Sequence, residues 1–252
     1  MPATGPQDVV IITGAAGGIG QALVRAYAQA GCAVLGVDRS AAPEDLPARH
    51  WLQVDLARSV ADADYAAGVF HTVRALLAGR PLRALVHNAA TQVLGGTTEL
   101  SLADWQLTLQ VNLLAPFLWT QALLPELEAA PGSVLHISSI HARLTKPGFV
   151  AYATSKAALS GLTRAMAVDL GGRVRVNALE PAAIATPMLE AGFAGDPDAR
   201  CTLDHCHPQG RIGQPQEVAA AALALTLGEA RFLHGACLAL DGGIGVRLHD
   251  PA

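Results

Sequence analysis

The chain has 252 residues, enough for one large α/β domain or two small ones. Its net charge is −4 and its isoelectric point is near 6.1, so it has no basic field for nucleic acid. Hydrophobic residues make up 51% of the chain, but the longest apolar run, 218–227, is about half a membrane span. The N-terminus resembles no secretory signal. We therefore expect a soluble cytoplasmic protein with neither a membrane nor a nucleic-acid partner.

Short apolar runs rich in Val, Ile and Leu predict strands buried on both faces, because they lack strict alternation. The runs are 9–13, 32–38, 50–55, 82–88, 132–138, 173–179 and 236–241. Helical patterns lie between them, at about 18–30, 59–78, 101–129, 149–170 and 215–227. This alternation predicts an α/β fold: one Rossmann-type domain over residues 1–252, with a doubly wound sheet of seven parallel strands flanked by helices.

Residues 186–214 depart from this alternation, being rich in Gly, Pro and Asp without a predicted strand. Such insertions commonly form a lid, so we expect a substrate loop here. The segment also holds Cys201, His205, Cys206 and His207, but their spacing fits no standard zinc site. We expect a mobile loop, no metal, and reduced thiols at all four cysteines of the chain.

The first predicted strand leads into a glycine-rich turn, TGAAGGIG (13–20), that opens the first helix. Gly14, Gly18 and Gly20 would allow a tight turn and let a pyrophosphate approach the helix N-terminus. Asp38 ends the second strand, where its carboxylate can accept hydrogen bonds from ribose hydroxyls and would repel a 2′-phosphate. This favours NAD over NADP, while the adjacent Arg39 could hold that phosphate.

Tyr152 and Lys156 lie four residues apart at the start of a predicted helix, so their side chains share one face. Taken alone, such a pair is more simply a surface tyrosine packed on a lysine stem.

Together, in this order, the motifs resemble those of the classical short-chain dehydrogenase/reductase family, from about residue 8 to 244. TGAAGGIG resembles its cofactor turn, HNAA (87–90) its N-N-A-G segment, and EPAAIATPM (180–188) its P-G-x-x-x-T-P segment. Ala90 and Ala182 stand where the family has glycines, so local geometry near the nicotinamide should differ slightly. The resemblance assigns these residues to the cofactor site: Gly14, Gly18, Ile19, Gly20, Asp38, Arg39, Asp55, Leu56, Asn88, Tyr152, Lys156, Pro181, Ile184 and Thr186.

The resemblance implies hydride transfer between a nicotinamide and a secondary alcohol or ketone, with catalytic residues Asn112, Ser139, Tyr152 and Lys156. Tyr152 would be the acid/base; because a phenol titrates near pH ~10, the Lys156 cation would favour the phenolate and also hold the nicotinamide ribose. Ser139 would hydrogen-bond the reacting oxygen. Asn112 would position a water that links Lys156 to solvent; otherwise it is a helix-kinking amide bonded to backbone.

Polar residues near the expected substrate site narrow the substrate class. His141, Arg143 and Lys146 follow Ser139, and Glu180 precedes the nicotinamide segment, which favours a polyhydroxylated or anionic substrate over a steroid. Arg143 and Lys146 could equally be solvated. His141 also resembles a residue of some sugar dehydrogenases in the family, so sugar or polyol oxidation is favoured. The alternatives are a 3-oxoacyl-type or other small-ketone reductase, and a non-catalytic dinucleotide-binding sensor or scaffold.

The resemblance also implies a homotetramer assembled through the helices at about 101–129 and 149–170. Small residues on the second helix would permit close packing across a two-fold axis: Ala157, Ala158, Gly161 and Ala165. We expect the tail, 245–252, to dock on a neighbouring subunit, the alternative being a disordered tail.

Overall fold

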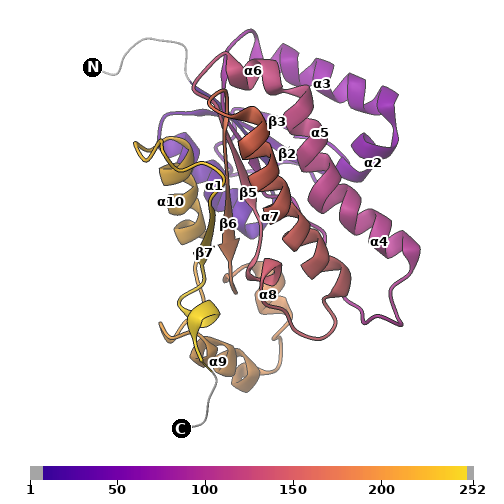
Figure 1. Cartoon of the computed structure of the whole chain (residues 1–252), viewed down its shortest axis with the longest axis vertical. Helices are drawn as coiled ribbons and strands as arrows, with labels where there is room; N and C mark the ends of the chain where they lie inside the picture. Colours follow the sequence, from indigo (N-terminus) through magenta and orange to yellow (C-terminus); the bar gives the residue numbers. More distant parts are fainter. Residues whose placement is uncertain (1–7, 249–252) are drawn as a thin grey trace.

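One sheet of seven parallel strands runs through the molecule, in the order β3-β2-β1-β4-β5-β6-β7 (Figure 1). The computed structural model describes residues 8–248. The strands are β1 (Val9–Thr13), β2 (Ala33–Asp38), β3 (His50–Gln53), β4 (Leu82–His87), β5 (Ser133–Ile137), β6 (Arg175–Pro181) and β7 (Cys237–Leu240). Each lies within about two residues of a predicted run, which confirms the predicted Rossmann-type sheet.

Helices cover both faces of the sheet. One face carries α1 (Gly18–Gln29) and α10 (Pro215–Thr226). The other carries α2 (Leu56–Ala61), α3 (Ala63–Leu77), α4 (Leu102–Leu109), α5 (Ala115–Ala122), α6 (Leu124–Glu128) and α7 (Val150–Leu170). Successive strand residues point to opposite faces, so Val9 and Ile11 enter one core while Val10 and Ile12 enter the other. This double burial explains the apolar runs of the inner strands. The prediction of burial on both faces is wrong for the edge strands β3 and β7, whose residues are partly buried or exposed because each has a neighbouring strand on one side only.

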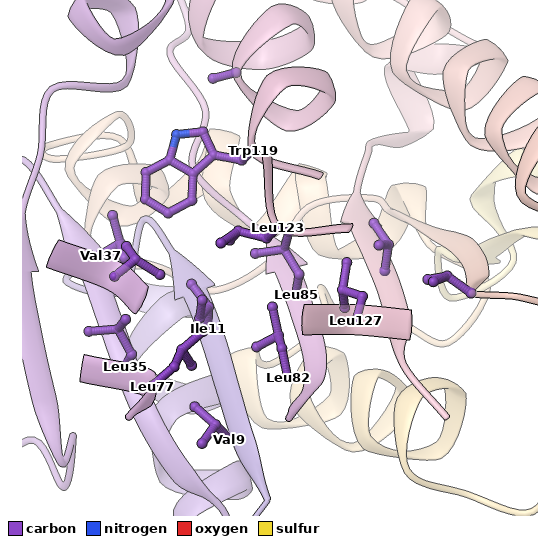
Figure 2. Packing of buried hydrophobic residues seen from close by; sticks show 14 of the residues in the cluster. Val9, Ile11, Leu35, Val37, Leu77, Leu82, Leu85, Trp119, Leu123 and Leu127 are labelled. Carbon is purple, nitrogen blue, oxygen red and sulfur yellow. The ribbon is translucent and has the colours of Figure 1, made fainter. Parts of the chain in front are cut away.

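The core on the α3–α7 face is centred on the fully buried Trp119 (Figure 2). Its indole meets the Phe70 ring edge-on at 5.3 Å, a favourable aromatic geometry. Leu123 and Leu127 continue the same helical stripe over β1 and β4, and both are 0% exposed. Each such side chain stabilises the fold by about 1.5–3 kcal/mol through burial. This core anchors the helices that lead to the carboxyl edge of the sheet.

Two predicted helices are interrupted. The helix expected over 59–78 is split at Asp62, whose side chain accepts from the Tyr65 nitrogen and begins α3. The helix expected over 101–129 contains a π-helical turn, Gln110–Leu114, and a second break before α6. Pro116 and Pro125 explain these breaks, because neither nitrogen carries the hydrogen that a continuous helix needs.

Residues 186–214 form no strand, as predicted, but they contain two short helices that the sequence analysis did not predict. The segment contains α8 (Pro187–Ala191) and α9 (Pro197–Cys206). Thr186 and Asp196 cap these helices with side-chain oxygens, and each helix begins at a proline, the residue suited to a first helical position. Within residues 8–248, no group of three or more His, Cys, Asp or Glu side chains is placed to hold a metal ion.

All four cysteines are free thiols. None of the helices in the described part of the chain combines the length and the apolar character needed to cross a membrane.

Candidate active site

The glycine-rich turn lies where the strand order reverses, with β2 on one side of β1 and β4 on the other. Thr13, which the sequence analysis did not single out, organises this point: its Oγ1 accepts from the backbone nitrogens of Asn88 and Ala89 at 3.1 and 3.2 Å. The Asn88 amide then donates to the Gly14 carbonyl at 2.9 Å. The only available signal for Thr13 was its place as the last residue before the turn. Threonine and asparagine together fix the backbone of the turn against β4.

This turn fits the pyrophosphate of a dinucleotide. The N-terminus of α1 has no side-chain cap and no acidic residue in its first turn, whereas Asp55, Asp62 and Ser101 cap α2, α3 and α4. Its positive end is therefore free for an anion. Gly14 has φ +65°, and a Cβ there would lie 2.6 Å from the Ala89 Cα. Ile19 and Gly20 follow in the first turn of α1.

The two carboxylates expected around the adenosine are partly engaged in local structure. Asp38 accepts from the Ala16 nitrogen at 3.0 Å and from the Ser40 nitrogen at 2.9 Å, which ties the end of β2 to the glycine-rich turn. Asp55 accepts from the Arg58 nitrogen at 3.1 Å, immediately before Leu56 begins α2. A carboxylate has about four acceptor positions, so both groups can accept further bonds. The Arg39 side chain is exposed next to Asp38.

Tyr152, Lys156 and Ser139 converge at the ends of α7 and β5. The first two turns of α7 place the Lys156 Nζ 5.6 Å from the centroid of the Tyr152 ring. The Ser139 side chain hydrogen-bonds the Tyr152 phenol. Lys156 donates to the Ile137 carbonyl at 2.8 Å, at the last residue of β5. Lys156 is only 2% exposed, so the pair is not a surface contact.

Burial controls the charges of this cluster. It raises the pKa of Tyr152, an effect that the Ser139 hydrogen bond partly offsets. It also lowers the pKa of Lys156 to about 8. The predicted lowering of the Tyr152 pKa by the Lys156 cation is therefore wrong for the protein without ligands. The ammonium faces the Ile137 carbonyl and the phenol is desolvated, so the loss of water dominates.

The Asn112 side chain hydrogen-bonds the backbone of Thr91 and the side chain of Ser155. Its Oδ1 accepts from the Thr91 nitrogen at 2.8 Å, and its Nδ2 donates to the Thr91 carbonyl and to the Ser155 Oγ, each at 2.9 Å. Ser155 in turn donates to the Tyr152 carbonyl at 2.7 Å. Asn112 lies in the π-helical turn, and its amide is bonded to backbone, which is the alternative to a water-positioning side chain that the sequence left open.

The expected substrate residues separate into two environments. The His141 ring stacks on Phe149 at 4.4 Å and meets Tyr152 edge-on at 5.6 Å, so it borders the tyrosine. Burial and the nearby Lys146 cation lower the pKa of His141. Arg143 instead turns toward Glu180, whose Oε2 accepts from its Nε at 2.7 Å.

The segment after β6 packs against the glycine-rich turn. Pro181 ends β6, the buried Ile184 bridges to Gly213, and Thr186 caps α8. A Cβ added to Gly18 would lie 2.9 Å from the Thr186 Cβ, so the two segments are in close contact. Behind 182–184 is a cavity of about 90 Å³, bordered by His207. Among residues 8–248, the Nε2 of this buried histidine has no hydrogen-bond partner.

Comparisons with known proteins agree with this geometry. Residues 14–245 match a family model described as enoyl-(acyl carrier protein) reductase. Protein FixR of Bradyrhizobium diazoefficiens is 35% identical over 95% of this chain and 87% of its own length. D-threitol dehydrogenase of Mycolicibacterium smegmatis is 36% identical over 95% of this chain and 93% of its own length. The ligand-free aldohexose dehydrogenase of Thermoplasma acidophilum has a TM-score of 0.90 at 30% identity, covering 98% of this chain and 97% of that one. The chain therefore belongs to the classical short-chain dehydrogenase/reductase family.

Proposed function

We propose that this oxidoreductase transfers hydride between NAD and a secondary alcohol of a sugar or polyol, with Tyr152 as the acid/base. The observation that carries the proposal is the half-buried Tyr152, whose phenol is hydrogen-bonded to Ser139 and lies one helical turn from Lys156, at the same sheet edge as the glycine-rich turn. The names of two relatives, D-threitol dehydrogenase and aldohexose dehydrogenase, support a polyol or sugar.

The nicotinamide supplies the hydride acceptor for alcohol oxidation. Tyr152 takes the hydroxyl proton of the substrate on its Oη, and Ser139 donates to the same substrate oxygen. The charged form of Lys156 favours the phenolate. Because burial raises the pKa of Tyr152, alcohol oxidation should accelerate as pH rises through the alkaline range, and ketone reduction should slow.

A substrate screen tests the reaction. Polyols, aldoses and simple secondary alcohols are incubated with NAD and the absorbance of NADH is followed, while 3-oxoacyl thioesters are offered with NADH. We expect turnover of polyols or sugars. Turnover of the thioesters alone would replace the proposal with a ketone reductase, and failure of every compound would favour a non-catalytic dinucleotide sensor.

We propose NAD as the preferred cofactor because Asp38 lies at the end of β2. Its carboxylate would accept from the ribose hydroxyls and repel a 2′-phosphate. NADH should therefore bind at least about ten-fold more tightly than NADPH in fluorescence titrations, and Asp38→Ser should narrow this difference. A preference for NADPH in the wild-type protein would mean that Arg39 governs the site instead.

We further propose a cytoplasmic homotetramer whose substrate loop is 186–214. The four free cysteines support a reducing compartment. Exposed apolar side chains on neighbouring helices support assembly: Leu102 is 73% exposed, Phe117 39% and Val168 86%. Ala157 and Ala165 are exposed on α7 as well. Sedimentation at several protein concentrations tests the tetramer, and a monomer at all of them would contradict it.

The tail prediction concerns 245–252, of which residues 249–252 lie outside the described part of the chain. Arg247 donates to the carbonyl of His205 in its own α9 at 2.8 Å, while Leu248 is 83% exposed. We propose that the end of the tail docks on a neighbouring subunit. Deletion of 246–252 should then lower the melting temperature of the assembly, and an unchanged assembly, melting temperature and KM would contradict docking.

A further inference from the structure

Arg143 reaches across the carboxyl ends of three neighbouring strands. It follows β5 by a few residues, pairs with Glu180 on β6 through its Nε, and places its Nη2 3.9 Å from the Asp241 Oδ2 just after β7. We propose that Glu180 is a positioning residue that holds Arg143 as a charge-compensated hydrogen-bond donor, so that the substrate site selects neutral hydroxyl groups over carboxylates. This inference rests on the proposed function and names its substrate class.

The sheet register puts this group at the level of the expected chemistry. Ile137 pairs with Leu179, and the Ser138 nitrogen donates to the Leu179 carbonyl at 2.8 Å. Ser138 is therefore level with Glu180, and the next residue, Ser139, is level with Pro181 at the end of β6. On the other side, Glu180 pairs with Ala239 of β7, two residues before Asp241. Arg143 thus lies over the strand ends that also carry Ser139.

Glu180 is a buried carboxylate whose orientation is fixed from two sides. Its side chain is 2% exposed, Oε2 accepts from Arg143 at 2.7 Å, and Oε1 accepts from the Ser160 Oγ at 2.9 Å. A buried carboxylate without such partners would be strongly unfavourable. The pairing therefore holds the Arg143 guanidinium in one place.

Hydrogen bonds connect this pair to the reacting groups. The Ser160 Oγ, whose proton goes to Glu180, can accept from the Ser138 Oγ at 2.9 Å; the Lys156 carbonyl, 3.1 Å from the same Ser138 oxygen, is the alternative acceptor for that single proton. Ser160 and Lys156 lie one turn apart on α7, and Ser138 precedes Ser139. The position of Arg143 is thereby set relative to both Lys156 and Ser139.

The charge balance decides what Arg143 can bind. One guanidinium lies between two carboxylates, so the group of Arg143, Glu180 and Asp241 carries one net negative charge. The Arg143 side chain is still 44% exposed, and its Nη1 has no partner among residues 8–248. A neutral hydroxyl oxygen of a substrate can accept a hydrogen bond from this nitrogen without electrostatic repulsion. A carboxylate in the same position would be repelled by the net negative charge of the group.

Glu180→Gln tests the inference because it removes one charge while keeping the size of the side chain. We compare kcat and KM for straight-chain polyols and the aldonates of the same skeleton, using NAD. The selectivity for polyol over aldonate should fall about ten-fold, through a lower KM for the aldonate, with the Kd of NADH nearly unchanged. Glu128→Gln is the matched control, because it breaks an ion pair with Arg173 of the same 2.7 Å length far from the site.

Arg143→Gln provides a second variant if Glu180→Gln does not fold. It should raise the KM for the polyol about ten-fold without lowering the KM for the aldonate. Arg143→Lys should raise the KM for the polyol less than Arg143→Gln does. Unchanged selectivity in a folded Glu180→Gln protein, unchanged polyol KM in Arg143→Gln, or a wild-type preference for aldonates would overturn the inference while leaving sugar oxidation intact.

The inference can also be tested without turnover. Polyols and aldonates are titrated into the enzyme–NADH complex, and binding is followed by NADH fluorescence. If no sugar or polyol is oxidised, the proposed function fails. Tighter aldonate binding by Glu180→Gln than by the wild type would still support the inference, and equal binding would overturn it.

Discussion

The site has two sides at the carboxyl edge of the sheet, and they are built differently. We call them the backbone side, at β1, β2 and β4, and the ionisable side, at β5, β6 and β7. At β1, β2 and β4 the site is made mainly of backbone: the uncapped start of α1, the glycines of the turn, and the bonds from Thr13 and Asn88 that hold them. At β5, β6 and β7 it is made of buried ionisable side chains, including Lys156, Glu180 and the neighbouring His136. The first side depends on shape and local geometry. The second depends on how much water is excluded from each charge.

Removing the phenol should affect the ionisable side alone, and it gives the largest expected effect. Tyr152→Phe should lower kcat by at least about 10³-fold, because general acid–base catalysis contributes roughly that much. The Kd of NADH should stay within about two-fold of the wild type, since the backbone side is untouched.

Tyr27→Phe is the matched control for that substitution. It removes another buried tyrosine hydroxyl, bonded to Thr226 at 2.6 Å, and should cost about 1 kcal/mol of stability without changing kcat. Substantial turnover by the Tyr152→Phe protein with any substrate of the wild type would contradict the division of the site.

Acid should destabilise the protein through the ionisable side. Burial and the Lys156 charge lower the pKa of His136 to about 3. The unfolded histidine takes up a proton near pH ~6.5, so stability is lost as pH falls below that value, by about 1.4 kcal/mol per pH unit for this residue. Burial also lowers the pKa of His87, which adds to the effect.

Between about pH 6.5 and 5, the free energy of unfolding of His136→Leu should fall by about 2 kcal/mol less than that of the wild type. Urea unfolding at both pH values measures this difference. The exposed His71, changed to Gln, should leave the pH dependence as it is in the wild type. The same slope for His136→Leu and the wild type would show that His136 is not kept neutral by burial.

The backbone side should respond to one added methyl group. In Gly18→Ala the new Cβ would lie 2.9 Å from the Thr186 Cβ and 3.1 Å from the Pro187 Cδ, which pushes the segment after β6 away from the turn. The Kd of NADH should rise about ten-fold, a loss of about 1.4 kcal/mol.

Gly68→Ala, inside α3, is the control because a Cβ there meets nothing within 4 Å. It should add up to about 1 kcal/mol of stability and leave the Kd unchanged. A Gly18→Ala protein that binds NADH as the wild type does would mean that the Thr186 segment moves aside freely.

Sequence alone predicted the sheet well because its signal is local and repeated. Each strand lies in a short, largely apolar run, and in the inner strands double burial removes the alternation that would suggest an exposed face. The interrupted helices were missed because the apolar period continues through Pro116 and Pro125, while the backbone breaks there. The helices of 186–214 were missed although Thr186-Pro187 and Asp196-Pro197 are both helix-start signals.

For the site, the spacing of Tyr152 and Lys156 was readable from the sequence because one helical turn relates them. The direction of the Tyr152 pKa was not, because it depends on burial by segments far away in the chain. The pairing of Arg143 with Glu180 spans 37 residues and required the register of β5 and β6. No sequence signal distinguished the buried His136 from the other residues of its strand.

The central position of β1 has a consequence for how the chain is made. β1 pairs with β2 on one side and with β4 on the other, and the Thr13 hydroxyl meets the Val86 carbonyl across 73 residues of sequence. At about 5–20 residues per second, a ribosome needs roughly 4–15 s to add that stretch. Throughout that time the edge of β1 that will pair with β4 has no partner, and four of its five residues are apolar. The nascent protein should therefore be most prone to aggregation, and most dependent on chaperones, before β4 emerges.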